Sequence, residues 1–353
     1  MSVVQKLDLR PGEWVEVRSA AEILSTLDDT ASLDNLPFMP EMLPLCGRRF
    51  KVYKRADRTC DPVSLTGLFR RMQDTVHLET ARCDGSSHGG CQAECLMFWK
   101  ETWLRRVPDG AGQSAPAGSR SAFEEGGLAS RDLVWLQSNA RRAPTPEGEL
   151  CYRCQATQLH KASGPLPFWR PTQYLRDVFT NDVPLKDVVF GLAVVILSKF
   201  RMKLTGRPFP NILGTLKRTP VENLDLRVGE WVVVKSREEI MKTLDTQGRN
   251  RGMTFESEMI PYCGKRYRVM RRVDKIIEET SGRIKQLSGV SVILENVICA
   301  SVYRRACPRA NYLYWREIWL RRAEPHEQPS SEPCAAAATC ALAHANGRMK
   351  ADA

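Results

Sequence analysis

The sequence predicts a mainly β fold with short helices (α+β), built twice along one chain. Residues 7–28, LDLRPGEWVEVRSAAEILSTLD, recur as residues 224–245, and 15 of the 22 positions are identical. The match resumes at 44–57 against 261–274, and it closes with FWKETWLRR at 98–106 against YWREIWLRR at 314–322. A repeat of this length predicts two copies of one structural module.

Each copy carries the same series of short elements. A strand is predicted at 13–18 and at 230–235, followed by a capping box that opens a helix over 20–27 and over 237–244. Alternating apolar and basic residues predict a second strand at 49–54 and 266–271, and a third strand at 75–79 and 291–295. Two tryptophans four residues apart in each closing block favour a helical turn before a last strand.

The GEWVxV opening of both copies resembles the start of SH3-like barrels, which bind nucleic acid or serve as docking modules. With several short strands per copy, the resemblance implies two duplicated, SH3-like, partly open barrels at residues 1–107 and 221–324. A helical segment is expected to join them.

The segments outside the two copies differ in composition. Residues 108–149 are rich in Gly, Ala, Ser and Pro and predict a flexible linker. Residues 150–220 predict a helical segment, with candidate helices at 171–179 and 185–204, and the Ala-rich residues 325–353 predict a disordered tail. The apolar run 188–197 is about half the length needed to span a bilayer, so a buried helix is favoured over a membrane-surface helix and no transmembrane segment is predicted.

Charge and cysteine content narrow the class of protein. The net charge of +11 favours a polyanionic partner such as nucleic acid, and a solvated basic surface is the alternative. The N-terminus has no apolar stretch of signal-peptide length, so a cytoplasmic protein is expected. In a reducing compartment, the 12 cysteines predict metal ligands or reactive thiols before disulfides.

Six residues form the predicted metal site. CDGSSHGGCQAEC supplies Cys83, His88, Cys91 and Cys95, and CYRC supplies Cys151 and Cys154. Cys91, Cys95, Cys151 and Cys154 would make one complete set of thiolates, with Cys83 or His88 as exchangeable ligands, for either zinc or an iron–sulfur cluster. Buried cysteines that act as small hydrophobes, or a redox dithiol at Cys151 and Cys154, are the alternatives.

The second copy keeps only part of this set. Cys299 and Cys307 align with Cys83 and Cys91, whereas Arg304 replaces His88, Asn311 replaces Cys95, and no C-x-x-C follows. The second copy is therefore expected to be structural. Three further kinds of residue are expected to be structural: the matched cysteines Cys46 and Cys263, His77, and the turn carboxylates Glu41 and Glu258, which could otherwise serve as acids or bases.

The chain resembles an uncharacterised bacterial protein family that shares the blocks CDGSxHGGCQAxC, CYRCQAT and YWREIWLRR, and this resemblance transfers no activity. The sequence favours a metal-stabilised binding or scaffold module for a polyanion or a protein partner. The alternative is a cysteine-ligated metalloenzyme of a specialised bacterial biosynthetic pathway, with Cys83, His88 or Glu41 at an open coordination position.

Overall fold

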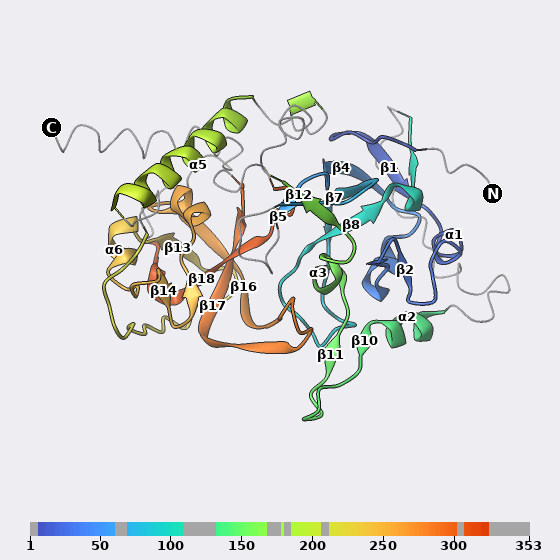
Figure 1. Ribbon diagram of the computed structural model, residues 1–353. Coiled ribbons are helices and arrows are strands. Elements are labelled where there is room, and N and C mark those ends of the chain that lie inside the picture. The colour runs from blue at the N-terminus through green and yellow to red at the C-terminus, as the bar shows by residue number, and fades with distance from the viewer. Residues whose placement is uncertain are drawn as a thin grey trace. The chain divides into compact units, whose positions relative to one another are not determined.

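The computed structural model describes residues 6–60, 69–108, 132–167, 178–179, 185–205, 212–301 and 307–324. The chain divides into two compact units: the first comprises Met1–Asp182 and Lys275–Lys285, and the second comprises Val183–Asp274 and Gln286–Ala353. Antiparallel strands and short helices make up most of the described part of both units (Figure 1). The predicted fold class, mainly β with short helices, is therefore confirmed.

The first unit is built on a five-stranded sheet with the order β8-β7-β4-β1-β9. Its strands are β1 (Trp14–Val17), β4 (Arg49–Arg55), β7 (Thr75–Arg82), β8 (Leu96–Lys100) and β9 (Leu104–Arg106). All four pairings are antiparallel. In β1 the side chains of Val15 and Val17 are buried while those of Trp14 and Glu16 are half-buried, as the period of two predicts.

Short helices and small sheets complete the first unit. The helices are α1 (Ala20–Leu24), η1 (Pro40–Leu45), η2 (Glu101–Trp103), α2 (Leu133–Asn139) and α3 (Gln155–Gln158). The remaining strands are β2 (Ser32–Leu33), β3 (Leu36–Pro37), β5 (Thr59–Cys60), β6 (Phe69–Arg71), β10 (Arg141–Arg142), β11 (Cys151–Tyr152) and β12 (Gly164–Leu166). The predicted capping box at the start of α1 is confirmed, because Ser19 and Glu22 each accept a hydrogen bond from the other's backbone amide.

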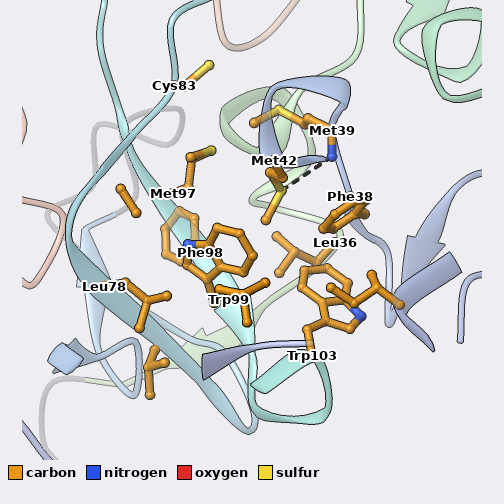
Figure 2. Packing of buried hydrophobic residues seen from close by; sticks show 14 of the residues in the cluster. Leu36, Phe38, Met39, Met42, Leu78, Cys83, Met97, Phe98, Trp99 and Trp103 are labelled. Carbon is orange, nitrogen blue, oxygen red and sulfur yellow. Dashed lines mark hydrogen bonds between the residues drawn. The ribbon is translucent and has the colours of Figure 1, made fainter. Parts of the chain in front are cut away.

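Tryptophans from the closing block fill the core of the first unit. Trp99 and Trp103 are fully buried, and the Phe38 ring lies edge-on to Trp103 with 5.4 Å between ring centroids (Figure 2). The indole Nε1 of Trp103 donates to Thr26 Oγ1 at 3.1 Å, so its one polar atom is satisfied. Trp99 lies on β8 and not in a helical turn, and the turn is the 3-10 helix η2 that follows.

The second unit repeats this arrangement with the sheet order β18-β17-β16-β13-β19. Its strands and helices are α5 (Leu185–Thr205), β13 (Trp231–Val234), α6 (Arg237–Met241), β14 (Arg249–Asn250), β15 (Met253–Thr254), η3 (Ser257–Tyr262), β16 (Arg266–Ile277), β17 (Ile284–Ile298), β18 (Tyr312–Arg316), η4 (Glu317–Trp319) and β19 (Leu320–Arg322). The packing of Trp319 matches that of Trp103. Its ring lies 5.6 Å from Phe255, and its Nε1 donates to Thr243 Oγ1 at 3.1 Å.

Three predicted boundaries differ from the structure. Residues 132–149 of the predicted linker contain α2 and β10, and residues 150–166 of the predicted helical segment form β11, α3 and β12. Residues 275–285, predicted as part of the second barrel, belong to the first unit. These elements are only two to seven residues long, so contacts with the rest of the unit stabilise them and no sequence period marks them. The rest of the linker, residues 171–177 and the predicted tail lie outside the described residues.

Helix α5 matches the helix predicted at 185–204, but it is only partly buried. Val188 and Val194 are buried, whereas Val189, Ile196 and Phe200 are each more than half exposed. The interpretation of this apolar run as a buried helix is therefore wrong for one face of α5.

A buried ion pair, which the sequence did not indicate, joins β4 to η2. Arg55 Nη1 lies 2.7 Å from Glu101 Oε1, and Arg55 Nε lies 2.9 Å from Asp57 Oδ2. Glu101 also accepts hydrogen bonds from the backbone amides of Asp8 and Leu9. The Arg55 side chain is 1% exposed and that of Glu101 3% exposed, so each charge depends on the other for its solvation.

We expect Glu101→Gln to destabilise the first unit by about 3 kcal/mol, because Arg55 would lose one of its buried carboxylate partners. The matched control is Glu317→Gln in the second unit, where the partner Arg272 is 33% exposed and can be solvated by water. Hydrogen exchange of β4 and β16 during urea unfolding measures the two effects separately. An equal loss from both variants would contradict the prediction.

Candidate metal centre

The loop between β7 and β8 carries the centre of the predicted ligand cluster. Pairing of Arg82 with Leu96, and a hydrogen bond of 2.9 Å from Cys83 N to Cys95 O, close the two ends of this loop. Within it, Gly85 O accepts from Gly90 N at 2.9 Å. Gly85 has a φ of +72°, and a Cβ there would collide with the carbonyl oxygen of Cys91. Glycine at this position therefore allows Cys91 to lie against the turn.

His88 lies at the middle of the cluster, between a carboxylate and a thiol. Its Nδ1 lies 2.9 Å from Glu41 Oε1, and its Nε2 lies 3.6 Å from Cys83 Sγ. Glu41 Oε1 also accepts from the backbone amide of Ser87 at 2.8 Å. The donor atoms of Glu41, Cys83 and His88 lie within 4.8 Å of one another, and all three residues are buried. This group of side chains could hold a metal ion.

Glu41 comes from η1, far from the loop in sequence. It is 8% exposed, and its second oxygen, Oε2, has no hydrogen-bond partner among the residues that the structure describes. A buried carboxylate oxygen without a donor costs free energy unless a cation or a proton compensates it. Its partner His88 supplies that positive charge when the imidazole is protonated.

Two more thiols surround His88. Burial raises the pKa of Cys91, but hydrogen bonds from His88 and from the amides of Ala93 and Ile277 outweigh it, so the net pKa of Cys91 is lowered. The Ile277 amide donates to Cys91 Sγ at 3.3 Å. Burial raises the pKa of Cys154, and the nearby Cys83 and Cys91 raise it further while His88 opposes the shift. Cys83 and Cys91 therefore lie close enough to Cys154 to raise its pKa in this buried environment.

The same neighbours also shift the pKa of the His88 imidazole. Burial alone would lower the pKa of His88, but hydrogen bonds to Cys83, Cys91 and Glu41 raise it above its usual value. The ring therefore favours its cationic form beside the Glu41 carboxylate. A bound divalent metal would supply positive charge in place of that proton, because metal ligands bind in their deprotonated forms.

Helix α3 places Cys154 at its N-terminal end. The next residue, Gln155, is 4% exposed and binds β8 through both backbone groups of Phe98: its Oε1 accepts from Phe98 N at 2.8 Å, and its Nε2 donates to Phe98 O at 2.9 Å. The residues 275–285 approach from another side, where Gln92 N donates to Lys275 O at 3.1 Å. Helix α3 and residues 275–285 thus both approach the β7–β8 loop that carries His88.

The structure does not gather all six predicted ligands. Cys83 and His88 lie in the three-residue group, and Cys91 and Cys154 are close enough to influence it. Cys151 is buried, but its Sγ donates to Glu149 O at 3.8 Å. Cys95 is half-buried and joins the loop through its backbone carbonyl. No described cysteine forms a disulfide.

Cys46, Cys263 and His77, which the sequence favours as structural, lie in buried surroundings. Burial raises the pKa of both Cys46 and Cys263 to about 12, as expected for thiols that only pack. His77 is fully buried on β7, where its Nδ1 lies 3.0 Å from Met97 O. Glu41, which the sequence favours as structural and places near a metal only in the metalloenzyme alternative, lies 2.9 Å from His88.

The second unit keeps a partial counterpart of the cluster. Cys299 Sγ lies 3.5 Å from Ser301 Oγ, which donates to Cys307 O at 2.8 Å. Glu258, at the position of Glu41, is 1% exposed. Arg304, at the position of His88, lies outside the described residues.

Comparison with known protein families, with curated proteins and with solved structures found no match.

We expect Gly85→Ala to disturb the cluster, because the added methyl would push the Cys91 carbonyl away from the turn. The matched control is Gly47→Ala, where φ is +74° but no atom lies within 4 Å of the added Cβ. The control should cost about 1 kcal/mol through backbone strain alone. Gly85→Ala should cost more and should also speed alkylation of Cys91, measured by mass spectrometry. Equal alkylation rates in both variants would contradict this account.

Proposed function

We propose that the chain is a binding module whose first unit is stabilised by a structural zinc ion. Cys83, His88, Cys91 and Cys154 would be its ligands, with Glu41 hydrogen-bonded to the far nitrogen of His88. The observation that carries the proposal is His88, held between a carboxylate at Nδ1 and a thiol at Nε2 in a buried position. Metal-ligating histidines in proteins commonly donate their second N–H to a carboxylate in this way.

The donor set favours zinc over an iron–sulfur cluster. Three thiolates and one imidazole make a closed tetrahedral site of the kind that structural zinc occupies. Clusters ligated through cysteine alone would need a fourth thiol, and Cys151 instead contacts Glu149 O. The proposal requires the side chains of Cys91 and Cys154 to close on the three-residue group. Zinc held by thiolates also fits a reducing compartment, so we propose a cytoplasmic location.

Burial favours a structural role over the metalloenzyme alternative. A catalytic zinc keeps one position open to water or substrate. Here Cys83, His88, Cys91 and Cys154 are each between 3% and 6% exposed. The ligands also come from the β7–β8 loop and the start of α3, segments that a bound ion would fasten together.

We expect one zinc per chain, without visible absorbance, in protein purified anaerobically and measured by elemental analysis. Cys154→Ser and His88→Ala should each release the metal, whereas the matched thiol variants Cys95→Ser and Cys151→Ser should retain it. Glu41→Gln should weaken zinc binding about 10- to 100-fold without abolishing it, because Glu41 orients a ligand.

Other outcomes would each contradict part of the zinc proposal. Visible charge-transfer bands with bound iron would indicate a cluster. Loss of metal from Cys151→Ser to the same degree as from Cys154→Ser would return the C-x-x-C pair to the ligand set. Complete loss from Glu41→Gln would make Glu41 itself a ligand.

We further propose that the two five-stranded sheets are duplicated SH3-like barrels. The identical strand order supports this, as does the 3-10 turn that precedes the last strand in each, η2 before β9 and η4 before β19. The registers of equivalent strands also agree: Trp14 pairs with Lys51, and Trp231 pairs with Arg268. Under this proposal the copies share a framework and differ in the side chains on their outer face.

One difference between the copies supports a polyanion partner for the second unit. In the first unit, Glu16 pairs with Arg49 at 3.3 Å and with Arg105 at 3.9 Å. In the second unit, the buried Val233 takes the place of Glu16, opposite Arg266 and Arg321. The second unit thus has an apolar side chain where the first unit has a carboxylate between two arginines. This difference makes the face of the second unit more basic.

An aromatic ring lies on the same face. Trp231 is 40% exposed, and the Arg266 guanidinium lies over it, 4.6 Å from the ring centroid. Arginine and an exposed aromatic ring together form a surface on which nucleic-acid bases stack while phosphates are neutralised. We therefore propose single-stranded RNA or DNA as the partner of this face.

We expect the chain to bind single-stranded RNA at about 50 mM salt, with affinity falling as salt rises. Trp231→Ala should weaken binding about tenfold, because one stacked base is worth about 1–3 kcal/mol. The matched variant Trp14→Ala removes the equivalent tryptophan of the first unit and should change binding little. Fluorescence anisotropy measures both. No binding at low salt, or equal losses from the two variants, would contradict the prediction.

A further inference from the structure

Helix α5 presents apolar side chains on two opposite faces. Val188 and Val194 are buried, at 9% and 6% exposure. The other face carries six exposed apolar residues: Leu185, Val189, Ile196, Leu197, Phe200 and Leu204, each 46% to 68% exposed. A helix that is apolar all round is normally buried all round. A continuous exposed apolar surface on one helix instead marks a site of interaction.

Five of the six residues form one stripe along the helix, and Leu197 lies beside it. Leu185, Val189, Ile196, Phe200 and Leu204 follow one another at intervals of four or seven, so they share one side of the helix. At 1.5 Å per residue the stripe is about 28 Å long. Figure 1 shows α5 as one uninterrupted helix, so the backbone keeps the helical period from Leu185 to Leu204.

Lysines lie at both ends of the stripe. Lys186 follows Leu185, and Lys203 precedes Leu204; both are exposed. On a helix of 3.6 residues per turn, Lys203 falls on the same side as Leu185, and Lys186 on the same side as Leu204. The stripe therefore has an apolar middle and a positive charge at each end.

This charge pattern disfavours a second copy of the chain as the occupant. In a parallel helix pair, each Lys186 would meet the partner's equivalent lysine. In an antiparallel pair, Lys186 would meet the lysine at position 203 of the other copy. Like charges meet in either orientation, and that repulsion opposes pairing.

A negatively charged lipid surface satisfies both parts of the pattern. Interfacial helices bury an apolar face among acyl chains while lysines reach the anionic headgroups. The net charge of +11 adds attraction to the same surface. In the described part of the chain, no helix has the length and apolar character required to cross a bilayer. We propose that the exposed face of α5 binds the surface of an anionic bilayer, lying in its plane.

Vesicle flotation with the full chain tests this proposal. Vesicles of phosphatidylcholine with phosphatidylserine are compared with vesicles of phosphatidylcholine alone. We expect the protein to float with the anionic vesicles only, and added salt to reduce the bound fraction. The double variant Ile196→Asp/Phe200→Asp should lower the partition coefficient about tenfold or more, because two apolar side chains would no longer enter the bilayer.

The matched control is Val221→Asp/Val228→Asp, which adds the same two charges at apolar residues of the second unit outside α5, 62% and 67% exposed. Binding by this control should stay within about twofold of the unmodified chain, because a Debye length of about 8–10 Å limits the reach of an added surface charge. Equal losses from both double variants would overturn the proposal, since net charge alone would then explain binding. Absence of binding to anionic vesicles would overturn it directly. Light scattering tests whether a second copy occupies the helix: a dimer that becomes a monomer in the α5 variant would overturn the membrane proposal. Retention of an acidic protein on α5 without vesicle binding would overturn it in favour of a protein partner.

Discussion

The arrangement around the cluster depends on one constraint: a histidine and a carboxylate are buried together, and their charges must be compensated without water. His88 and Glu41 satisfy each other at 2.9 Å, and the remaining ring nitrogen faces Cys83. Moving either group into solvent would require opening the β7–β8 loop. Burial of this pair therefore links the loop to η1, and the thiols of Cys91 and Cys154 extend the same link to the residues 275–285 and to α3.

Much of the sheet framework was predictable because its signals are local. Alternation of apolar and basic residues marked the strands at 49–54 and 266–271, which the structure shows as β4 and β16. The Ser19–Glu22 capping box lies within four residues, so tertiary contacts were not needed to recognise it. The elements missed include α2, β10 and β11, which are too short to be stable alone and form because the unit packs around them.

The ligand cluster was only partly predictable, because spacing does not fix the direction of a side chain. The C-x-x-C pattern suggested that Cys151 and Cys154 point to one metal. In the structure Cys151 lies on β11 and donates to a nearby carbonyl, while Cys154 precedes α3 and is buried near His88. The sequence places Glu41 near a metal only in the metalloenzyme alternative, because 46 residues separate it from Ser87, whose amide it binds beside His88.

The two copies share some residues of the cluster and differ in others. Residues shared by both copies first suggested a common framework, yet Glu41, Cys83 and Cys91 are shared and lie in or beside the cluster. The second copy lacks the imidazole that joins them, since Arg304 stands at the position of His88, and it has no counterpart of Cys154. A guanidinium does not bind zinc, because it has no lone pair to offer a metal. The same copy replaced Glu16 by Val233, which removes a carboxylate from a basic face. Under the proposed functions, the first copy carries the metal ligands and the second copy carries the more basic face. The metal therefore stabilises one copy, and the other copy binds the nucleic acid.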